Sequence, residues 1–390
     1  METRTEIMVE VTNQFLQELQ PDDDSVQNFE VILGQLLRKV NEKFAENGMC
    51  ALLHLSTVII VPLFVKLLPL VSICVDENAY VLGLYREDGK KKGIYDCSTH
   101  SIALYLRNLC RSHVLPAEKT LVREIMKIAP QKELCRNKNL IPVNNGIFDC
   151  ATKTLLPFSP DYVFTAKCRV DYREDAHNVL IHNSKDNTEW DVEQWLASLV
   201  NRKKDISEIW QVLCNIIRPC DEQQHSAWLY VANDLIDLKL RVLCRFMQNL
   251  CSRYCSDSLR SFKNSRYAED MVSHIAWIGY TRWAGQPIDT FARVKDMLYG
   301  KKIPAMSSFK SKRMELSFRY FFVQFLNEAP RIADTSEKIW KHQMFISLIN
   351  TDISRDEYDF LMEECVGNQE VLEYVLHKVL HRIADVNESA

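Results

Sequence analysis

The chain has 390 residues, of which 47% are hydrophobic and 26% are charged, so a disordered or low-complexity protein is excluded. A formal net charge of −4 excludes a histone-like polycation, and any nucleic-acid binding therefore needs a local basic patch. Only 10 residues are glycine, well below the usual share of roughly 7%. Because phosphate-binding loops use glycines to bring backbone N–H groups close to the anion, a nucleotide site has to be demonstrated in this sequence.

The 13 cysteines include no C-x-x-C pair, which favours a reduced, cytoplasmic protein without a structural zinc site. Residues 49–75 are almost wholly apolar and long enough to span a bilayer. However, Lys66 and two prolines, Pro62 and Pro69, interrupt them, and no basic flank sets an orientation. We therefore expect a buried helix or strand pair and no membrane partner.

Periodicity predicts the elements of the first half of the chain. Two amphipathic helices are expected in the first fifty residues, separated by Pro21 and three aspartates. The elements that follow are strands in 72–94 with a turn at Asp88-Gly89, helices at 101–110 and 118–128, and a turn-rich β stretch at 140–172.

The second half has an alternating α/β pattern. One helix is expected to carry Trp190, Trp195 and Leu199, a second to span 206–213, and a third to carry Cys244, Cys251 and Cys255. Buried strands are expected at 227–232, 275–279 and 320–326, and a helical face at 371–380. Strands alternating with helices predict a three-layer α/β unit of the kind that houses nucleotides.

Residues 140–172 read LIPVNNGIFDCATKTLLPFSPDYVFTAKCRVDY. This block resembles the signature of the primase–helicase replication proteins of phages, plasmids and integrated mobile elements. In that pattern a strand ends in Asn-Gly, a hairpin follows, and then a phrase of the form pF-sP-dyvFT. A generic hairpin followed by a proline turn is the alternative reading.

Later blocks resemble the same family in the same order. They are Trp195-Leu196, 209–212, 227–230, 284–289, 327–334 and 370–380. The resemblance implies an α/β protein with a helical N-terminal region at 1–70, an α+β primase-associated domain at 71–205 and a three-layer, AAA+-like superfamily-three helicase core at 206–390. The resemblance also implies that the protein assembles into rings on DNA. Relatives usually continue into a winged-helix module, whereas this chain stops at Ala390, so we expect that extension to be lacking.

An ATPase of this family needs a glycine-rich loop with a lysine and a hydroxyl residue. The loop should follow Tyr230, but residues 231–241 contain no glycine and no hydroxyl after the lysine. Alignment from the helix at 244–251 places Leu240 at the lysine position, with Lys239 one residue away. Lys239 is thus the one candidate nucleotide-binding residue, and a solvated helix lysine is the favoured reading of it.

The other catalytic elements also depart from the family. Where an acidic pair should hold Mg²⁺, the chain has Tyr280-Thr281-Arg282. Lys341 and His342 occupy the positions of twin arginines, and neither provides a bidentate guanidinium. Only Asn327, at the sensor position, is kept. Asn327 and Lys341 are therefore the remaining candidate catalytic residues, no metal ligands are assigned, and the ATP and Mg²⁺ that the family uses do not fit this sequence.

DNA contact is the function that the sequence leaves in place. Residues 299–313 carry five cations and no acid. The five are Lys301, Lys302, Lys310, Lys312 and Arg313. They occupy the place of the family's lysine-bearing segment near the ring channel and could bind phosphates without sequence preference. A solvated basic loop is the alternative. His377 and His381, one helical turn apart, are interpreted as surface histidines rather than a zinc pair.

We therefore interpret the chain as a DNA-replication-type protein of a phage or mobile element that binds single- or double-stranded DNA and has lost or impaired ATP hydrolysis. It would assemble as a homo-oligomeric ring or with active helicase subunits. Two alternatives stay open, so whether the chain is an enzyme is undecided. One is an active ATP-dependent helicase with an atypical phosphate loop, and the other is a non-catalytic scaffold for protein contacts.

Overall fold

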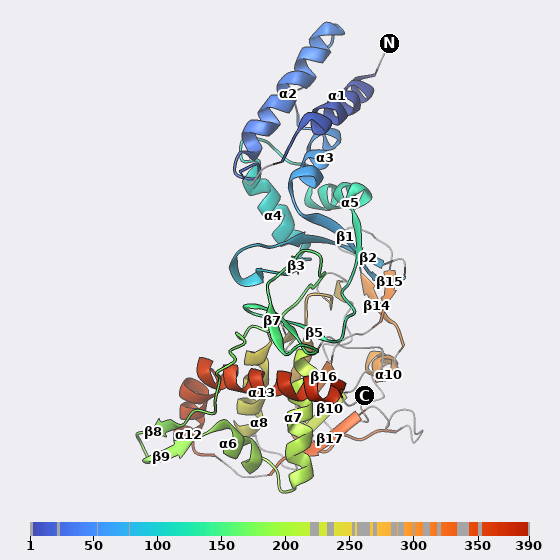
Figure 1. Cartoon of the computed structure of the whole chain (residues 1–390). Coiled ribbons are helices and arrows are strands. Elements are labelled where there is room, and N and C mark those ends of the chain that lie inside the picture. Colours follow the sequence, from blue (N-terminus) through green and yellow to red (C-terminus); the bar gives the residue numbers. More distant parts are fainter. Residues whose placement is uncertain are drawn as a thin grey trace. The chain divides into compact units, whose positions relative to one another are not determined.

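In a computed structural model, the described residues are 3–21, 24–52, 54–77, 79–218, 226–231, 238–251, 254–255, 266–267, 271–281, 287, 292–298, 301–306, 313–317, 321–333, 343–349 and 353–388 (Figure 1). The chain divides into two compact units. The first consists of Met1–Leu134 with Tyr267–Ser273 and Met306–Met314, and the second of Cys135–Arg266, His274–Ala305 and Glu315–Ala390.

The first unit begins with helices α1 (Arg4–Glu18), α2 (Phe29–Glu46) and α3 (Thr57–Leu67). Thr3 and Glu6 form a capping box at the start of α1, so two N–H groups that a helix start leaves unpaired are satisfied. Phe29 and Phe64 stack in the core with ring centroids 5.0 Å apart. The apolar segment forms buried helix α3 and then a strand, and no helix in the described ranges is long and apolar enough to cross a membrane.

A four-stranded sheet follows in the same unit, in the order β3-β2-β1-β4. Its strands are β1 (Leu70–Asp76), β2 (Ala79–Tyr85), β3 (Tyr95–Asp96) and β4 (Gln131–Glu133), and its helices are α4 (Thr99–Leu109) and α5 (Glu118–Ile128). The expected turn at Asp88-Gly89 lies between antiparallel strands β2 and β3, where a 3-10 turn spans Gly89–Lys91 and Gly89 adopts a φ of +67°. A residue without Cβ fits that left-handed conformation.

The second unit starts with short antiparallel strands. They are β5 (Leu140–Val143), β6 (Gly146–Asp149) and β7 (Thr154–Leu156) in one sheet, and β8 (Ile181–Asn183) and β9 (Thr188–Trp190) in another. Helices α6 (Val192–Ser198) and α7 (Lys203–Ile217) follow. The prediction that Trp190 lies on a helix is wrong. It ends strand β9, because Asp191 caps α6 only afterwards by accepting the N–H groups of Glu193 and Gln194.

A five-stranded parallel sheet forms the centre of the second unit, in the order β11-β13-β16-β10-β17. Its strands are β10 (Ser226–Tyr230), β11 (Tyr254–Cys255), β13 (Ala276–Thr281), β16 (Phe321–Leu326) and β17 (Gln343–Ser347). The three buried strands expected from the sequence are thus confirmed within a mixed α/β fold. The first strand along the chain, β10, lies inside the sheet between β16 and β17.

Alternation along the strands gives the parallel sheet two different faces. One face, with Leu229, Ile278 and Val323, joins the apolar core that also contains buried residues of helices α7, α8 (Leu238–Leu250) and α13 (Gln369–Glu388). The other face includes Trp228, Trp277 and Phe322. The Phe322 ring centroid lies 5.6 Å from that of Trp228 and 6.3 Å from that of Trp277.

The remaining described elements are α10 (Ala292–Leu298), the sheet of β12 (Arg266–Tyr267), β14 (Ile303–Met306) and β15 (Arg313–Leu316), helix α12 (Arg355–Phe360), and a π-helical turn at Leu361–Cys365.

Helix α8 ends at Leu250, and Cys255 lies in strand β11. The expectation that Cys244, Cys251 and Cys255 share one helix is therefore wrong for the last two. Cys251 instead forms an isolated antiparallel bridge with Cys168.

Candidate functional site

The carboxyl edge of the parallel sheet is the place where an open α/β sheet binds ligands. Strands β10, β13 and β16 end there at Tyr230, Thr281 and Leu326. Helix α8 is the next described element after β10, and Asn327 comes directly after β16. Positions 239–240, 281 and 327, which the sequence relates to a nucleotide site, therefore lie on α8, at the end of β13 and directly after β16.

Leu240 lies at the position expected for the phosphate-binding lysine. It has no exposed surface and is part of the apolar core, beside other fully buried residues of α8 such as Val242 and Leu243. Its neighbour Lys239 is partly exposed and has an interaction elsewhere in the protein. A cation at position 240 would have to leave water for an apolar core, which carries a large desolvation cost.

Thr281 lies where the family's acidic pair is expected, and it is 3% exposed. Its hydroxyl donates a hydrogen bond to Oε1 of Gln324, a fully buried residue of β16, at 3.0 Å. Nε2 of Gln324 is also buried and finds no hydrogen-bond partner in the described part of the protein. Both groups are neutral, and neither supplies the carboxylate that Mg²⁺ prefers.

Asn327 is 6% exposed and takes part in an interaction. Its place after β16 puts it at the same edge as Thr281, since β13 and β16 are parallel neighbours with Thr281 opposite Leu326. Lys341, the other candidate catalytic residue, lies outside the described residues. Gln324 was missed by the sequence reading, although a single amide within the apolar run 321–326 was a usable signal.

The basic segment is described only at its two ends. Lys301 is exposed, and its backbone N–H donates to the Asp296 carbonyl at 2.8 Å while its Nζ lies 3.7 Å from the Asp296 carboxylate. Lys302 is half-buried. Lys310 and Lys312 lie outside the described residues, and Arg313 begins β15, the neighbour of β14 in its sheet.

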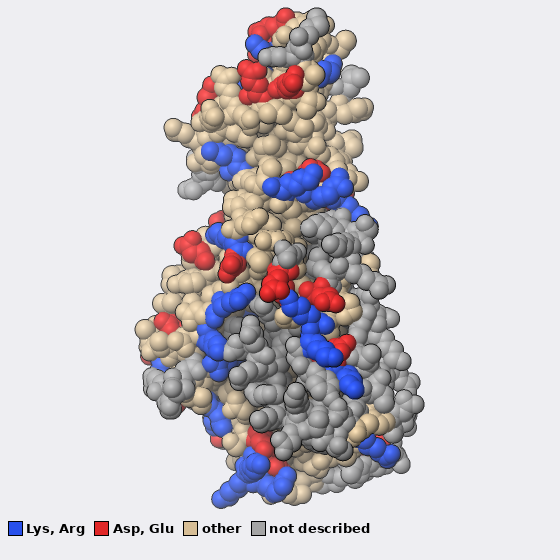
Figure 2. Space-filling model, turned by 90° about the vertical axis from the view of Figure 1, so that its right-hand side faces the viewer, with Lys and Arg blue, Asp and Glu red and all other residues tan. Residues whose placement is uncertain are grey.

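Charges of both signs are interspersed on the surface seen in Figure 2. Lys and Arg side chains form small separate groups there, with Asp and Glu side chains among them. The described part of that face therefore carries no continuous basic surface. Among the described residues, no group of three or more His, Cys, Asp or Glu side chains could hold a metal ion.

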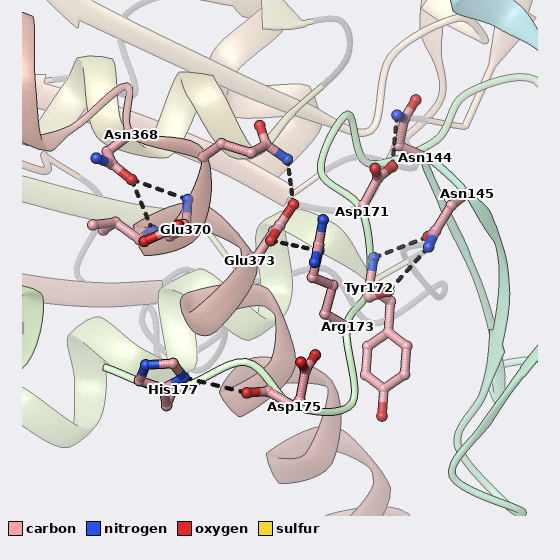
Figure 3. A network of polar contacts seen from close by, with 12 residues as sticks. Asn144, Asn145, Asp171, Tyr172, Arg173, Asp175, His177, Asn368, Glu370 and Glu373 are labelled. Carbon is pink, nitrogen blue, oxygen red and sulfur yellow. Dashed lines mark hydrogen bonds and ion pairs between the residues drawn. The ribbon is translucent and has the colours of Figure 1, made fainter. Parts of the chain in front are cut away.

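The signature block is held together by two asparagines, as Figure 3 shows. Asn144 donates to the Asp171 carboxylate at 2.8 Å. Asn145 donates to the Tyr172 carbonyl at 3.0 Å and accepts the Tyr172 N–H at 2.9 Å, so one amide pairs with both backbone groups of one residue. Gly146 is required because a Cβ there would lie 2.6 Å from the Leu156 carbonyl oxygen. These signature residues therefore have a structural role.

The same block packs against helix α13. Arg173 forms an ion pair with Glu373 at 2.9 Å, and Gln369 donates to the other oxygen of that carboxylate at 2.8 Å (Figure 3). His377 stacks on the Tyr172 ring at 5.8 Å, and the Tyr172 hydroxyl lies 3.2 Å from Nε2 of His381. The two histidines are thus half-buried packing residues, which corrects their interpretation as surface residues.

Helix α13 also contacts α6 through charged groups. Glu193 accepts hydrogen bonds from the Tyr374 hydroxyl and from Nζ of Lys378, which lies 4.6 Å from the centre of the Trp210 ring. Burial would raise the pKa of Glu193, but these two donors hold it below the usual range. Burial raises the pKa of Tyr374, and the Glu193 carboxylate adds to this. The cluster is structural, because its charges pair with one another.

Part of the chain is similar to a known protein family. The family model described as D5 N terminal like matches residues 73–201. Over these residues, called the D5 N terminal like region, the chain is similar to that family. This match confirms the resemblance to phage-type primase–helicase proteins, and it includes the Asn144-Asn145 signature and helix α6. This similarity covers about a third of the chain.

The similarity to a solved helicase structure is weak. A crystal structure of JCV helicase bound to a thiazolopyridine-containing acetamide matches with 14% identity and a TM-score of 0.30. The match covers 50% of this chain and 61% of that chain, so this chain spans less than two thirds of the helicase chain. Curated protein sequences gave no match.

Proposed function

We propose that the protein is a replication-type DNA-binding protein of phage or mobile-element origin whose helicase-like core no longer hydrolyses ATP. The observation that carries this proposal is the burial of Leu240. At the position where the resemblance requires a phosphate-binding lysine, the chain has an apolar side chain with no exposed surface.

The five-stranded parallel sheet supports the proposal that the second part of the chain is AAA+-like. Its first strand, β10, lies inside the sheet, and helix α8 follows that strand directly among the described elements. We propose the domain layout accordingly, with a helical region at 1–70, a primase-associated domain at 71–205 and a helicase-like domain at 206–390.

Loss of hydrolysis is supported at two further positions of the same sheet edge. Thr281 and Gln324 form a neutral, buried pair where a metal-binding carboxylate would be needed. Phosphoryl transfer in this class depends on positioned metal ions and cations, so an edge with Leu240 and Thr281 cannot supply the usual chemistry. ATP and Mg²⁺ therefore do not fit the described residues, and no catalytic step is assigned to them.

DNA binding rests on the basic segment at 299–313. Five cations in a short stretch can neutralise phosphates, which gives affinity without reading bases. The Asp296 carboxylate lies 3.7 Å from Nζ of Lys301, so it offsets part of that charge. We propose that the protein acts on DNA as a ring or together with active helicase subunits, located in the cytoplasm.

A steady-state ATP hydrolysis assay, with and without single-stranded DNA, tests this function. We expect turnover no higher than that of a protein-free blank in both conditions. DNA-stimulated hydrolysis would instead establish the alternative of an active helicase with an atypical phosphate loop. The absence of both hydrolysis and DNA binding would favour the protein-contact scaffold.

A further inference from the structure

Two buried cysteines from distant parts of the second unit lie opposite each other. Cys168 and Cys251 form an isolated antiparallel bridge. The N–H of Arg169 donates to the Leu250 carbonyl at 3.3 Å, so the backbone hydrogen bond comes from residues that flank the two cysteines. This pattern defines Cys168 and Cys251 as a non-hydrogen-bonded antiparallel pair.

Such a pair has the backbone geometry that a disulfide needs. Directly opposed residues of this kind have Cα atoms about 4.5 Å apart, with both side chains on the same side of the strands. Disulfides span Cα separations of roughly 4.4–6.8 Å. The Cα separation typical of such a pair thus lies within the range that a disulfide spans.

The reduced thiols are buried and each has its own acceptor. Neither cysteine has exposed surface. Sγ of Cys168 lies 2.8 Å from the Leu250 carbonyl oxygen, and Sγ of Cys251 lies 3.9 Å from that of Ile216. Burial raises the pKa of Cys168 to about 12 and the pKa of Cys251 well above its ordinary value. Both thiols are thus protonated near neutral pH, and a thiolate, the reactive form, is rare.

We propose that Cys168 and Cys251 are a site of reversible oxidation, at which hydrogen peroxide oxidises the two thiols to a cross-strand disulfide. Peroxide is small enough to enter a transiently opened core. One thiolate attacks the peroxide, the O–O bond breaks, and a sulfenic acid and hydroxide result. The second sulfur then attacks the sulfenic sulfur, the S–O bond breaks, and the departing oxygen leaves as water with the thiol proton. Two electrons pass from the two sulfurs to the peroxide, and two waters are formed in total.

The disulfide would fasten the D5 N terminal like region to the core of the second unit. Cys168 belongs to the signature block, and Cys251 directly follows α8, the helix after β10. The bond would close a loop that contains α6, α7, β10 and α8. Cross-links over long loops restrict the unfolded chain and so stabilise the fold. This proposal is independent of whether the protein binds DNA or ATP.

Peroxide treatment of the full chain at mildly alkaline pH, followed by alkylation and peptide mass spectrometry, tests the site. We expect a peptide pair joined through Cys168 and Cys251, reversed by dithiothreitol, and a thermal midpoint raised by roughly 5 °C or more in the oxidised protein. Cys168→Ser keeps a donor for the Leu250 carbonyl, so it should fold and lose both the joined pair and the thermal shift.

Cys110 provides the matched control, because it is also buried with a pKa raised to about 12 but lies at the end of helix α4. Cys110→Ser should leave the joined pair and the thermal shift unchanged. Complete oxidation of the exposed Cys50 with Cys168 and Cys251 still alkylated as free thiols would overturn the proposal. Joining of either cysteine to a different partner, or oxidation to unpaired sulfinic acids, would overturn it equally.

Discussion

The Thr281 hydroxyl donates a hydrogen bond to the Gln324 side chain at 3.0 Å, linking two neighbouring strands inside the parallel sheet. Both residues are almost fully buried, and the amide nitrogen of Gln324 has no partner in the described part of the protein. This pair occupies the region where the resemblance to primase–helicase proteins requires carboxylates. Its chemistry is that of structural packing.

Removing the hydroxyl should therefore cost stability. Thr281→Val leaves Oε1 of Gln324 buried without a donor, and we expect the free energy of unfolding to fall by about 1–3 kcal/mol in chemical denaturation. The double variant Thr281→Val/Gln324→Leu removes both polar partners and should lose less than the single variant. Equal or greater loss in the double variant would contradict the view that the single variant is destabilised by an unsatisfied Gln324 oxygen.

The signature asparagine makes a second stability prediction. Asn145→Ala removes both hydrogen bonds to the Tyr172 backbone and leaves the backbone groups of a buried residue unpaired, so we expect a loss of about 1–3 kcal/mol. Asn137→Ala is the control, because its side chain accepts the Asn139 N–H in an exposed turn. Its effect should stay within about 0.5 kcal/mol. Similar losses in the two variants would refute a special role for the signature.

How far the sequence predicted this protein differs between its parts. Local periodicity predicted the strands at β10, β13 and β16, because short apolar runs bounded by turn residues are typical of buried parallel strands. Periodicity misplaced Trp190, because it did not locate the N-cap of α6 at Asp191. Trp190 precedes that cap and therefore lies in strand β9. It could not foresee the Cys168–Cys251 bridge or the packing of His377, because both depend on tertiary contacts between segments far apart in the chain.

The sequence predicted the candidate site mainly through residues that depart from the family's nucleotide-binding pattern. Leu240 and Thr281 departed from the family pattern in the sequence itself, and burial then gave those departures a physical meaning. The partnership of Thr281 with Gln324 needed the strand order, which no local pattern contains. The DNA-contact role of the basic segment is a proposal, and the role of Lys341, which lies outside the described residues, stays a prediction.

Acid should destabilise the second unit through His377. Burial lowers the pKa of this histidine, and His381 beside it lowers it further, while Glu174 acts in the opposite direction. Tyr172 stacks on its ring. Since the folded pKa lies below the unfolded value of about 6.5, the unfolded state binds more protons as the pH falls. Stability from this residue is therefore present above about pH 6.5 and is lost as the pH falls toward the folded pKa.

We expect the free energy of unfolding, measured by denaturation across this pH window, to decline less steeply in His377→Gln than in the parent protein. The exposed His182 is the control, and His182→Gln should keep the parental slope. An unchanged slope in His377→Gln would show that the burial of this histidine does not contribute to the pH dependence.

The basic segment makes a prediction about salt. Alanine at positions 301, 302, 310, 312 and 313 should weaken single-stranded DNA binding and reduce the steepness of its salt dependence, because each phosphate contact releases counterions. Fluorescence anisotropy at several salt concentrations measures both. Alanine at Lys203 and Lys204, an exposed basic pair at the start of α7, is the control and should have little effect. Equal affinity and slope in the parent and the segment variant would reject the DNA-contact assignment.

Isothermal titration calorimetry with ATP, with and without Mg²⁺, most directly tests the proposal that the helicase-like core no longer binds nucleotide. With Leu240 buried at the lysine position and a neutral Thr281–Gln324 pair at the metal position, we predict no magnesium-dependent binding heat at millimolar ATP. Saturable binding that requires Mg²⁺ would contradict the account.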